Sequence, residues 1–211
     1  MCGIFAFWAR ESVPSEEVFY WLIKEAEKRG QDGTSFAIIR DGEVILTSKF
    51  GSVATCVREI KEFMKVEDIL LLSCRATPET EKETNSDMLQ PVKGDKAILI
   101  HNGGVTESVR VKDYDYKTEI DSEIILAAYE KHNYNMKQTM EYLSGSFAFV
   151  MLDVLKKKLY SVCSFNPLAH MYVKGVGYFL HSNNDALGKA LQLMTGCSKD
   201  GMNVWENWYH H

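Results

Sequence analysis

The chain opens with MCGIFAFW at residues 1–8, and this stretch joins a strand pattern to a chemically unusual start. Residues 3–9 form a short apolar run that suits a buried β-strand. The apolar part is too short for a secretory signal, and Gly3 stands one place too late for N-myristoylation. Cys2 follows the initiator methionine directly, a position that packing alone does not require. The stretch is therefore either a plain N-terminal strand or a strand that carries a reactive group at its tip.

The chemistry of Cys2 favours the second reading. Loss of Met1, which a small second residue permits, would leave one residue with both a thiol and a free α-amine. Their ordinary pKa values are about 8.5 and about 8, so part of the amine is unprotonated near neutral pH. The amine can take the thiol proton directly or through one water, which makes Cys2 nucleophile and base together. This chemistry needs no catalytic histidine.

Composition limits the class of protein. The 211 residues are 45% hydrophobic and 25% charged, which fits a globular domain with a substantial core. The net charge of −5 argues against nucleic acid and anionic membranes as partners, and no apolar segment approaches the ~18 residues that span a bilayer. Five cysteines without a C-x-x-C pair, and six histidines without ligand spacing, predict no disulfide framework, no metal, no other cofactor and a cytoplasmic location.

The hydrophobic pattern predicts one domain over residues 1–211, with the tail at about 197–211 left unassigned. We expect a helix from an N-cap at Ser15 towards Gly30, a hairpin around Asp41-Gly42, and further helices over 120–132 and 185–194. Buried strands are expected at 69–75 and 96–102, and two more hairpins at 146–164 and 171–182. Helices interleaved with hairpins predict an α+β fold with antiparallel sheets.

Polar residues follow two of these strands. In HNGG (101–104), the Asn102 side chain and the Gly103 N–H could donate hydrogen bonds to a developing oxyanion, or the segment could be an ordinary turn. In SCRATPE (73–79), Arg75 could bind a carboxylate in a two-pronged contact or form a surface salt bridge. Each pattern alone leaves both readings open.

Two further segments have the same ambiguity. Asp121, in DSE (121–123), could face a substrate ammonium group or simply cap a helix. RGQDG (29–33) could be a loop that folds over a site, or the end of a helix followed by a turn.

Taken together and in order, these segments resemble a class II, N-terminal-nucleophile glutamine amidotransferase domain. The similarity is greatest to the glutaminase domains of glucosamine-6-phosphate synthase and amidophosphoribosyltransferase. It rests on the segments MCGIFAF, RGQDG, SCRAT, HNGGVTE, TEIDSEII, LSGSFAFVMLD and FNPLAHMYV, and it covers about residues 2–190.

The resemblance implies a four-layer αββα sandwich of two antiparallel sheets, as in N-terminal-nucleophile (Ntn) hydrolases. It implies an enzyme that releases ammonia from L-glutamine through a γ-glutamyl thioester on Cys2. The implied site residues are Cys2 as nucleophile and base, Asn102 and Gly103 as oxyanion donors, Arg75 and Asp121 as partners of the glutamine carboxylate and ammonium, and Thr77 and Arg29 as further substrate contacts.

We expect no synthase half within 211 residues, so the ammonia would pass to a separate acceptor subunit or to water. Two alternatives stay open. The substrate could be another γ-glutamyl amide, or the chain could be a catalytically silent glutamine-binding module that regulates a partner.

Overall fold

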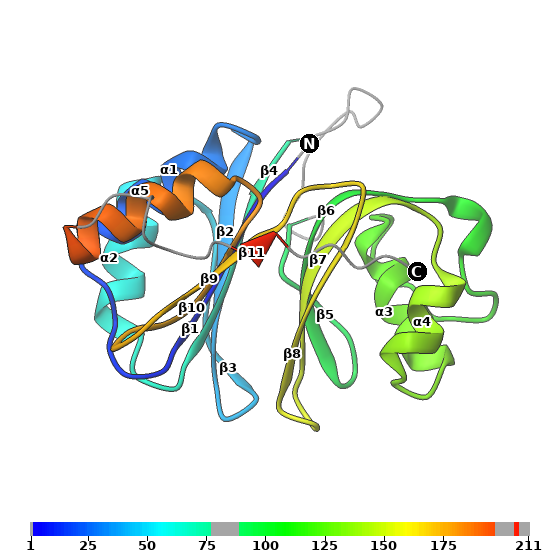
Figure 1. The fold of residues 1–211 in the computed structure, drawn as a ribbon. Helices are drawn as coiled ribbons and strands as arrows, with labels where there is room; N and C mark the ends of the chain where they lie inside the picture. The colour runs from blue at the N-terminus through cyan, green and yellow to red at the C-terminus, as the bar shows by residue number, and fades with distance from the viewer. Residues whose placement is uncertain (1, 77–88, 197–204, 207–211) are drawn as a thin grey trace.

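The computed structural model describes residues 2–76, 89–196 and 205–206 of the chain. Within them, two antiparallel sheets lie face to face (Figure 1). The larger has the strand order β11-β9-β10-β1-β4-β2-β3, made of β1 (Gly3–Ala9), β2 (Gly33–Arg40), β3 (Glu43–Gly51), β4 (Ile69–Arg75), β9 (Ala169–Val173), β10 (Gly177–His181) and β11 (Trp205–Glu206). The smaller has the order β5-β6-β7-β8, made of β5 (Val92–Lys93), β6 (Ala97–Val105), β7 (Gly145–Asp153) and β8 (Lys158–Ser164).

Helices cover the outer faces of both sheets (Figure 1). The larger sheet carries α1 (Glu16–Glu27), α2 (Val53–Phe63) and α5 (Asn184–Thr195), and the smaller one carries α3 (Ser122–Lys131) and α4 (Met136–Tyr142). A short 3-10 helix, η2 (Glu107–Val109), follows β6. The predicted α+β class and the four-layer αββα order are both confirmed.

In the described part of the chain, three separate apolar cores hold the four layers together. Side chains alternate along a strand, so β1 sends Phe5 and Phe7 towards α1 and Ile4 and Ala6 towards the second sheet. β6 likewise contributes Ile98 and Ile100 to the core between the sheets and Leu99 to the core under α3. Because both faces of these strands are buried, they read in the sequence as nearly continuous apolar runs.

β1 is the middle strand of the larger sheet and pairs on both sides. Gly3 lies opposite Cys74 of β4, and Phe5 lies opposite His181 of β10. A Cβ atom on residue 3 would lie 2.0 Å from the Ala26 carbonyl oxygen of α1, so only glycine fits beneath this helix. The backbone is therefore held in place from Gly3 onward, directly after Cys2.

Ser182 and His181 secure this end of β1. The Ile4 N–H donates to Ser182 Oγ (3.1 Å), and the Ser182 N–H donates to the Ile4 carbonyl (3.0 Å). His181 is fully buried; its Nδ1 accepts the Asn183 N–H (2.8 Å), so its Nε2 is the nitrogen that donates to the Leu22 carbonyl of α1 (3.0 Å). Burial lowers the His181 pKa to about 4.

The local predictions are confirmed at several points. Ser15 caps α1 by accepting the Val18 N–H, and Asp41 and Gly42 both have positive φ (52° and 87°), as a two-residue hairpin turn requires. Both later hairpins and the helix α5 also form.

Other details differ from the prediction. Four elements, α2, α4, β5 and β11, are additional to those that the sequence predicts. The strand expected at 96–102 continues to Val105, because Gly145–Ala148 of β7 pair with it throughout; HNGG is thus part of a strand and not a turn. Trp205 and Glu206, in the unassigned tail, add a short strand to the edge of β9.

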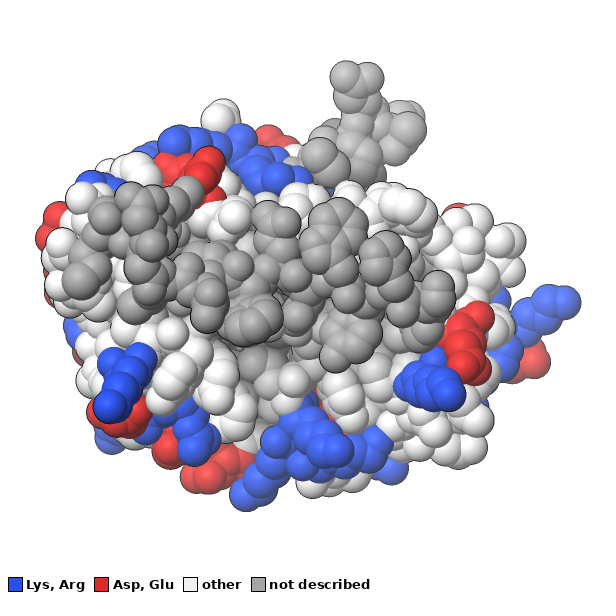
Figure 2. All heavy atoms as spheres, viewed as in Figure 1, with Lys and Arg blue, Asp and Glu red and all other residues white. Residues whose placement is uncertain are grey.

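Charge is mixed on the face shown in Figure 2. Among the described side chains drawn there, positive and negative residues are interspersed, apart from one group of Lys and Arg at lower centre. In the same described part of the chain, no helix has both the length and the apolar character needed to cross a bilayer.

We predict that His181 makes the folded state less stable in mild acid. The unfolded chain binds a proton at this residue below about pH 6.5, whereas the folded chain does so only below about 4. The free energy of unfolding should therefore decrease as pH falls, by about 2 kcal/mol between pH 7 and pH 5 from this residue. Urea unfolding of the wild type and of His181→Gln at pH 7 and pH 5 measures this change in the free energy of unfolding. An equal pH dependence in the two proteins would contradict this account.

Candidate active site

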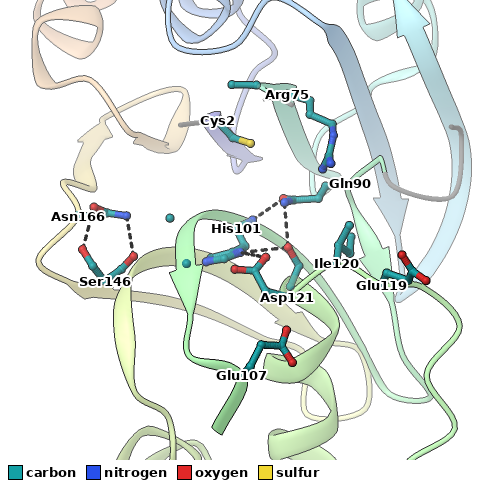
Figure 3. Close-up of a pocket in the computed structure, with 14 residues that line it drawn as sticks. Cys2, Arg75, Gln90, His101, Glu107, Glu119, Ile120, Asp121, Ser146 and Asn166 are labelled. Atoms are coloured by element: carbon teal, nitrogen blue, oxygen red, sulfur yellow. Dashed lines mark hydrogen bonds and ion pairs between the residues drawn. The ribbon is translucent and has the colours of Figure 1, made fainter. Parts of the chain in front are cut away.

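A cavity of about 560 Å³ opens where the two sheets meet beside the start of β1 (Figure 3). Cys2 stands directly before β1, and Arg75 ends β4 of the larger sheet. Gly103 lies in β6 of the second sheet, and Asp121 stands directly before α3. The cavity therefore brings together four of the residues that the sequence singled out. The full lining is Cys2, Arg75, Ala76, Gln90, His101, Gly103, Gly104, Glu107, Glu119, Ile120, Asp121, Ser122, Ser146 and Asn166.

Cys2 differs from the other described cysteines. It is half-buried and the only one of the four that lines the cavity. Burial raises the pKa of Cys56 and of Cys74 to about 12, and it also raises the pKa of Cys163. These three thiols are therefore poor nucleophiles near neutral pH.

Arg75 ends β4 and is almost fully buried. Its carbonyl accepts the Asp32 N–H (3.0 Å), and a Cβ atom on Gly30 would lie 2.5 Å from the Arg75 carbonyl carbon. The RGQDG segment is thus the turn after α1, packed against the end of β4. Arg29 is not among the residues that line the cavity; its guanidinium donates to the Ser182 carbonyl (3.4 Å). Thr77 lies outside the described residues.

Asn102 lies in β6, directly before the cavity-lining Gly103, and is completely buried. Within the described part of the chain, neither its Nδ2 nor its Oδ1 has a hydrogen-bond partner. Leaving such a buried group unpaired costs on the order of 1–3 kcal/mol, so an amide in this state is suited to a ligand that completes its bonding. Gly103 has φ of 117°, a conformation that a residue with a side chain rarely adopts.

Asp121 occupies the N-cap position of α3, but its side chain does not cap the helix. Instead Oδ2 accepts the Val105 N–H (2.9 Å), and Oδ1 lies 3.6 Å from His101 Nδ1. The side chain is about 31% exposed, so its carboxylate keeps access to the cavity while the end of β6 holds it in place.

A buried polar network supports Asp121 from behind (Figure 3). Gln90 accepts the His101 backbone N–H on Oε1 (2.5 Å) and donates from Nε2 to Ser122 Oγ (3.0 Å). Ser122 Oγ lies 3.0 Å from His101 Nδ1. Burial lowers the pKa of His101, with the nearby Asp121 carboxylate acting in the opposite direction. The lowered pKa favours an uncharged imidazole at neutral pH, placed between the strand and the helix.

Sequence reasoning missed this support. Gln90, His101, Ser122, Ser146 and Asn166 all line the cavity, yet none was singled out as a site residue. Four of them, His101, Ser122, Ser146 and Asn166, stand inside segments that were quoted for the resemblance. Their polar side chains beside buried strands were the available signal. No group of three or more His, Cys, Asp or Glu side chains among the described residues is arranged to hold a metal ion.

Comparison with known proteins identifies relatives of this arrangement. A family model described as "Glutamine amidotransferase domain" matches residues 77–189, which is 113 of the 211 residues. The chain is 26% identical over 183 residues to 7-cyano-7-deazaguanine synthase 2 of Sulfurisphaera tokodaii, covering 81% of this chain and 40% of that protein. It is 30% identical over 164 residues to the 7-cyano-7-deazaguanine synthase of Saccharolobus solfataricus, covering 72% of this chain and 35% of that protein.

Among solved structures, the glutamine phosphoribosylpyrophosphate amidotransferase of B. subtilis matches with a TM-score of 0.61 and 19% identity, over 90% of this chain and 43% of that one. This likeness confirms the predicted fold type. The chain spans well under half the length of each of these three proteins.

The two adjacent glycines of the cavity wall allow a matched test of the site's geometry. We predict that Gly103→Ala lowers the free energy of unfolding by at least about 2 kcal/mol, because a Cβ would lie 2.1 Å from Asn166 Nδ2 and the backbone conformation disfavours a side chain. The nearest atom to a Cβ on Gly104 is Asp121 Oδ2 at 3.8 Å, an ordinary contact distance. Gly104→Ala should therefore change the free energy of unfolding by less than about 0.5 kcal/mol. Urea unfolding measures both; equal losses would show that the described wall is wrong.

Proposed function

The chain belongs to the class II, N-terminal-nucleophile glutamine amidotransferase family, and we propose that its cavity releases ammonia from the side-chain amide of L-glutamine by attack of Cys2. The observation that carries this proposal is the cavity's set of groups: one accessible thiol, a buried cation at Arg75 and a carboxylate at Asp121. Free glutamine is a zwitterion with an amide, and these groups match its three reactive or charged parts.

The substrate would lie across the space between the two sheets. Arg75 comes from the end of β4 in the larger sheet, and its planar guanidinium suits the α-carboxylate. Asp121 comes from the start of α3 beside the second sheet and would accept the α-ammonium group. The side-chain amide would then face Cys2. Thr77 and Arg29 stay as further substrate contacts in this proposal, on the resemblance of their motifs alone.

The reaction would proceed in two halves. The free α-amine of Cys2 takes the thiol proton, and the sulfur attacks the amide carbon of glutamine. The oxygen that gains negative charge accepts hydrogen bonds from Asn102 Nδ2 and the Gly103 N–H. The C–N bond breaks, the amine's proton passes to the leaving group, and ammonia departs from a γ-glutamyl thioester. Water, deprotonated by the same amine, then releases glutamate and restores the thiol.

The wider setting is also proposed. We propose that a synthase subunit accepts the ammonia, with water as the alternative; the relatives extend well beyond the part that matches this chain. We treat residues 1–211 as one domain, since the two sheets share a core. The described cysteines are all free thiols, which supports a reducing, cytoplasmic compartment.

We predict that the purified chain releases ammonia from glutamine and that Cys2→Ala lowers the rate by at least about 10³-fold, because the substitution removes the nucleophilic thiol while the α-amine of residue 2 remains. A coupled ammonia assay measures the rate, and circular dichroism checks the fold. The matched control is Cys163→Ala, a thiol outside the cavity, which should keep the wild-type rate.

Loss of Met1 must be verified by intact mass in the same samples, because an acylated amine cannot serve as base. A fully active Cys2→Ala protein would reject Cys2 as nucleophile. A silent binding module would bind glutamine without releasing ammonia.

Asp121 tests whether free glutamine is the substrate. Asp121→Asn removes the charge but keeps an oxygen that can accept the Val105 N–H. We predict that kcat/KM for glutamine falls by about 10²-fold or more, mainly through KM, because the ammonium loses its partner in the ground and transition states alike. N-acetylglutamine has no ammonium group and should be a poor substrate that the substitution hardly affects. Unchanged kinetics with glutamine would favour another γ-glutamyl amide.

A further inference from the structure

We propose that Asn166 is a positioning residue that fixes the peptide between Asn102 and Gly103, so that the Gly103 N–H points into the cavity beside Cys2. This inference rests on the proposed function, in which that N–H stabilises the oxyanion. Asn166 lines the cavity next to Ser146 (Figure 3), yet it has no role in the reaction as described above.

The contacts of Asn166 join three segments. Its Nδ2 donates to the Asn102 carbonyl (3.0 Å) and to the Ser146 carbonyl (3.1 Å), and its Oδ1 lies 3.2 Å from Ser146 Oγ. Carbonyl oxygens only accept hydrogen bonds, so the two contacts identify the NH₂ end of the amide without ambiguity. One side chain after β8 therefore ties β6 to β7 at the cavity wall.

The Asn102 carbonyl and the Gly103 N–H belong to the same peptide unit. Such a unit is planar and trans, so its C=O and N–H point in opposite directions. Any group that fixes the direction of the carbonyl also fixes the direction of the N–H. Asn166 holds the carbonyl end of this unit, and the N–H must face the other way.

The neighbouring residue shows which way that is. The His101 N–H donates to Gln90 Oε1, on the β5 side of β6. Backbone groups alternate along an antiparallel strand, so the Asn102 carbonyl faces β7 and the Gly103 N–H faces the β5 side again. Among the described residues, β5 pairs with Ile98 and Leu99 of β6 and does not reach Gly103. The N–H is thus directed to the side where the cavity begins.

A hydrogen bond at the carbonyl also strengthens the donor at the other end. Hydrogen-bonded peptide units polarise one another, so the partly buried bond from Asn166 makes the Gly103 N–H a better donor. The close approach needs glycine at this place: a Cβ on residue 103 would lie 2.1 Å from Asn166 Nδ2.

The chain beside Asn166 is held in an unfavourable shape. Phe165 has a positive φ of 65° and is 94% exposed, although an aromatic residue disfavours both states. Ser164 Oγ donates to the Gly145 carbonyl (3.2 Å), so the residues on either side of Phe165 are tied to β7. These bonds hold the turn in a conformation that brings Asn166 to the peptide.

The test is Asn166→Asp, which keeps the size of the side chain but removes the NH₂ donor. We expect kcat for glutamine to fall by about 10- to 100-fold with KM within about twofold, less than the 10²–10³-fold that loss of a whole oxyanion donor costs. Asn166→Ala, which adds no charge, should show the same split between kcat and KM. The matched control is Asn135→Asp at the N-cap of α4, where either residue serves and no change is expected.

A second readout does not depend on activity. The Gly103 amide signal in a ¹H–¹⁵N spectrum should shift in Asn166→Asp and stay in place in Asn135→Asp, with melting temperatures confirming that both proteins fold. A wild-type kcat in both Asn166 variants, a loss confined to KM, or an unmoved Gly103 signal would overturn the inference. An inactive wild type with a shifted Gly103 signal would reject the proposed function and leave the positioning role standing.

Discussion

The first strand of the chain is the middle strand of the larger sheet, and the rest of the site depends on this constraint. A residue whose α-amine takes part in chemistry must be the first residue of the processed chain, and chain ends are ordinarily the least ordered part of a domain. Here β4 and β10 pair with β1 on both sides, and Gly3 fits against the Ala26 carbonyl where no side chain could. Cys2 is therefore held one residue beyond a rigid element.

The second sheet supplies the other half of the cavity, because the sheets stack with a shared core. Ile4 and Ala6 of β1 pack in the same core as Ile98 and Ile100 of β6. Asn102 and Gly103 follow two and three residues after Ile100 along β6. Asn102 brings a buried amide that has no hydrogen-bond partner among the described residues, and Gly103 lines the same cavity as Cys2. The packing of the two sheets therefore fixes the relative positions of the cavity-lining groups, and each sheet alone would carry only part of the site.

The sequence predicted much of this arrangement and missed specific parts for physical reasons. Strong local signals, such as Asp41-Gly42 and the Ser15 cap, led to correct elements. The α2 helix also had a readable signal, with Val53, Cys56, Val57 and Ile60 on one face behind Ser52, and it was overlooked. β5 and β11 are each two residues long and are defined by their pairing with β6 and β9, so no local sequence pattern predicts them.

The same distinction applies to the site. Cys2, Arg75, Gly103 and Asp121 stand in short motifs and were found, and the cavity brings them together. Gln90 and Asn166 make hydrogen bonds to β6 residues that stand 11 and 64 positions away in the sequence, respectively. Such bonds depend on strand register, and register is a property of the folded sheets. The residues proposed to take part in the reaction were thus easier to predict than the residues that hold the cavity wall in place.

The central claim is that the Cys2 thiol reacts with the side chain of bound glutamine. A glutamine analogue with a diazoketone in place of the amide loses N₂ when a thiolate attacks it and leaves a stable thioether. Peptide mass spectrometry after incubation with the analogue should find one adduct per chain, on the Cys2 peptide lacking Met1, and excess glutamine should prevent it. An adduct on another cysteine, or none in a protein that releases ammonia from glutamine, would contradict the account.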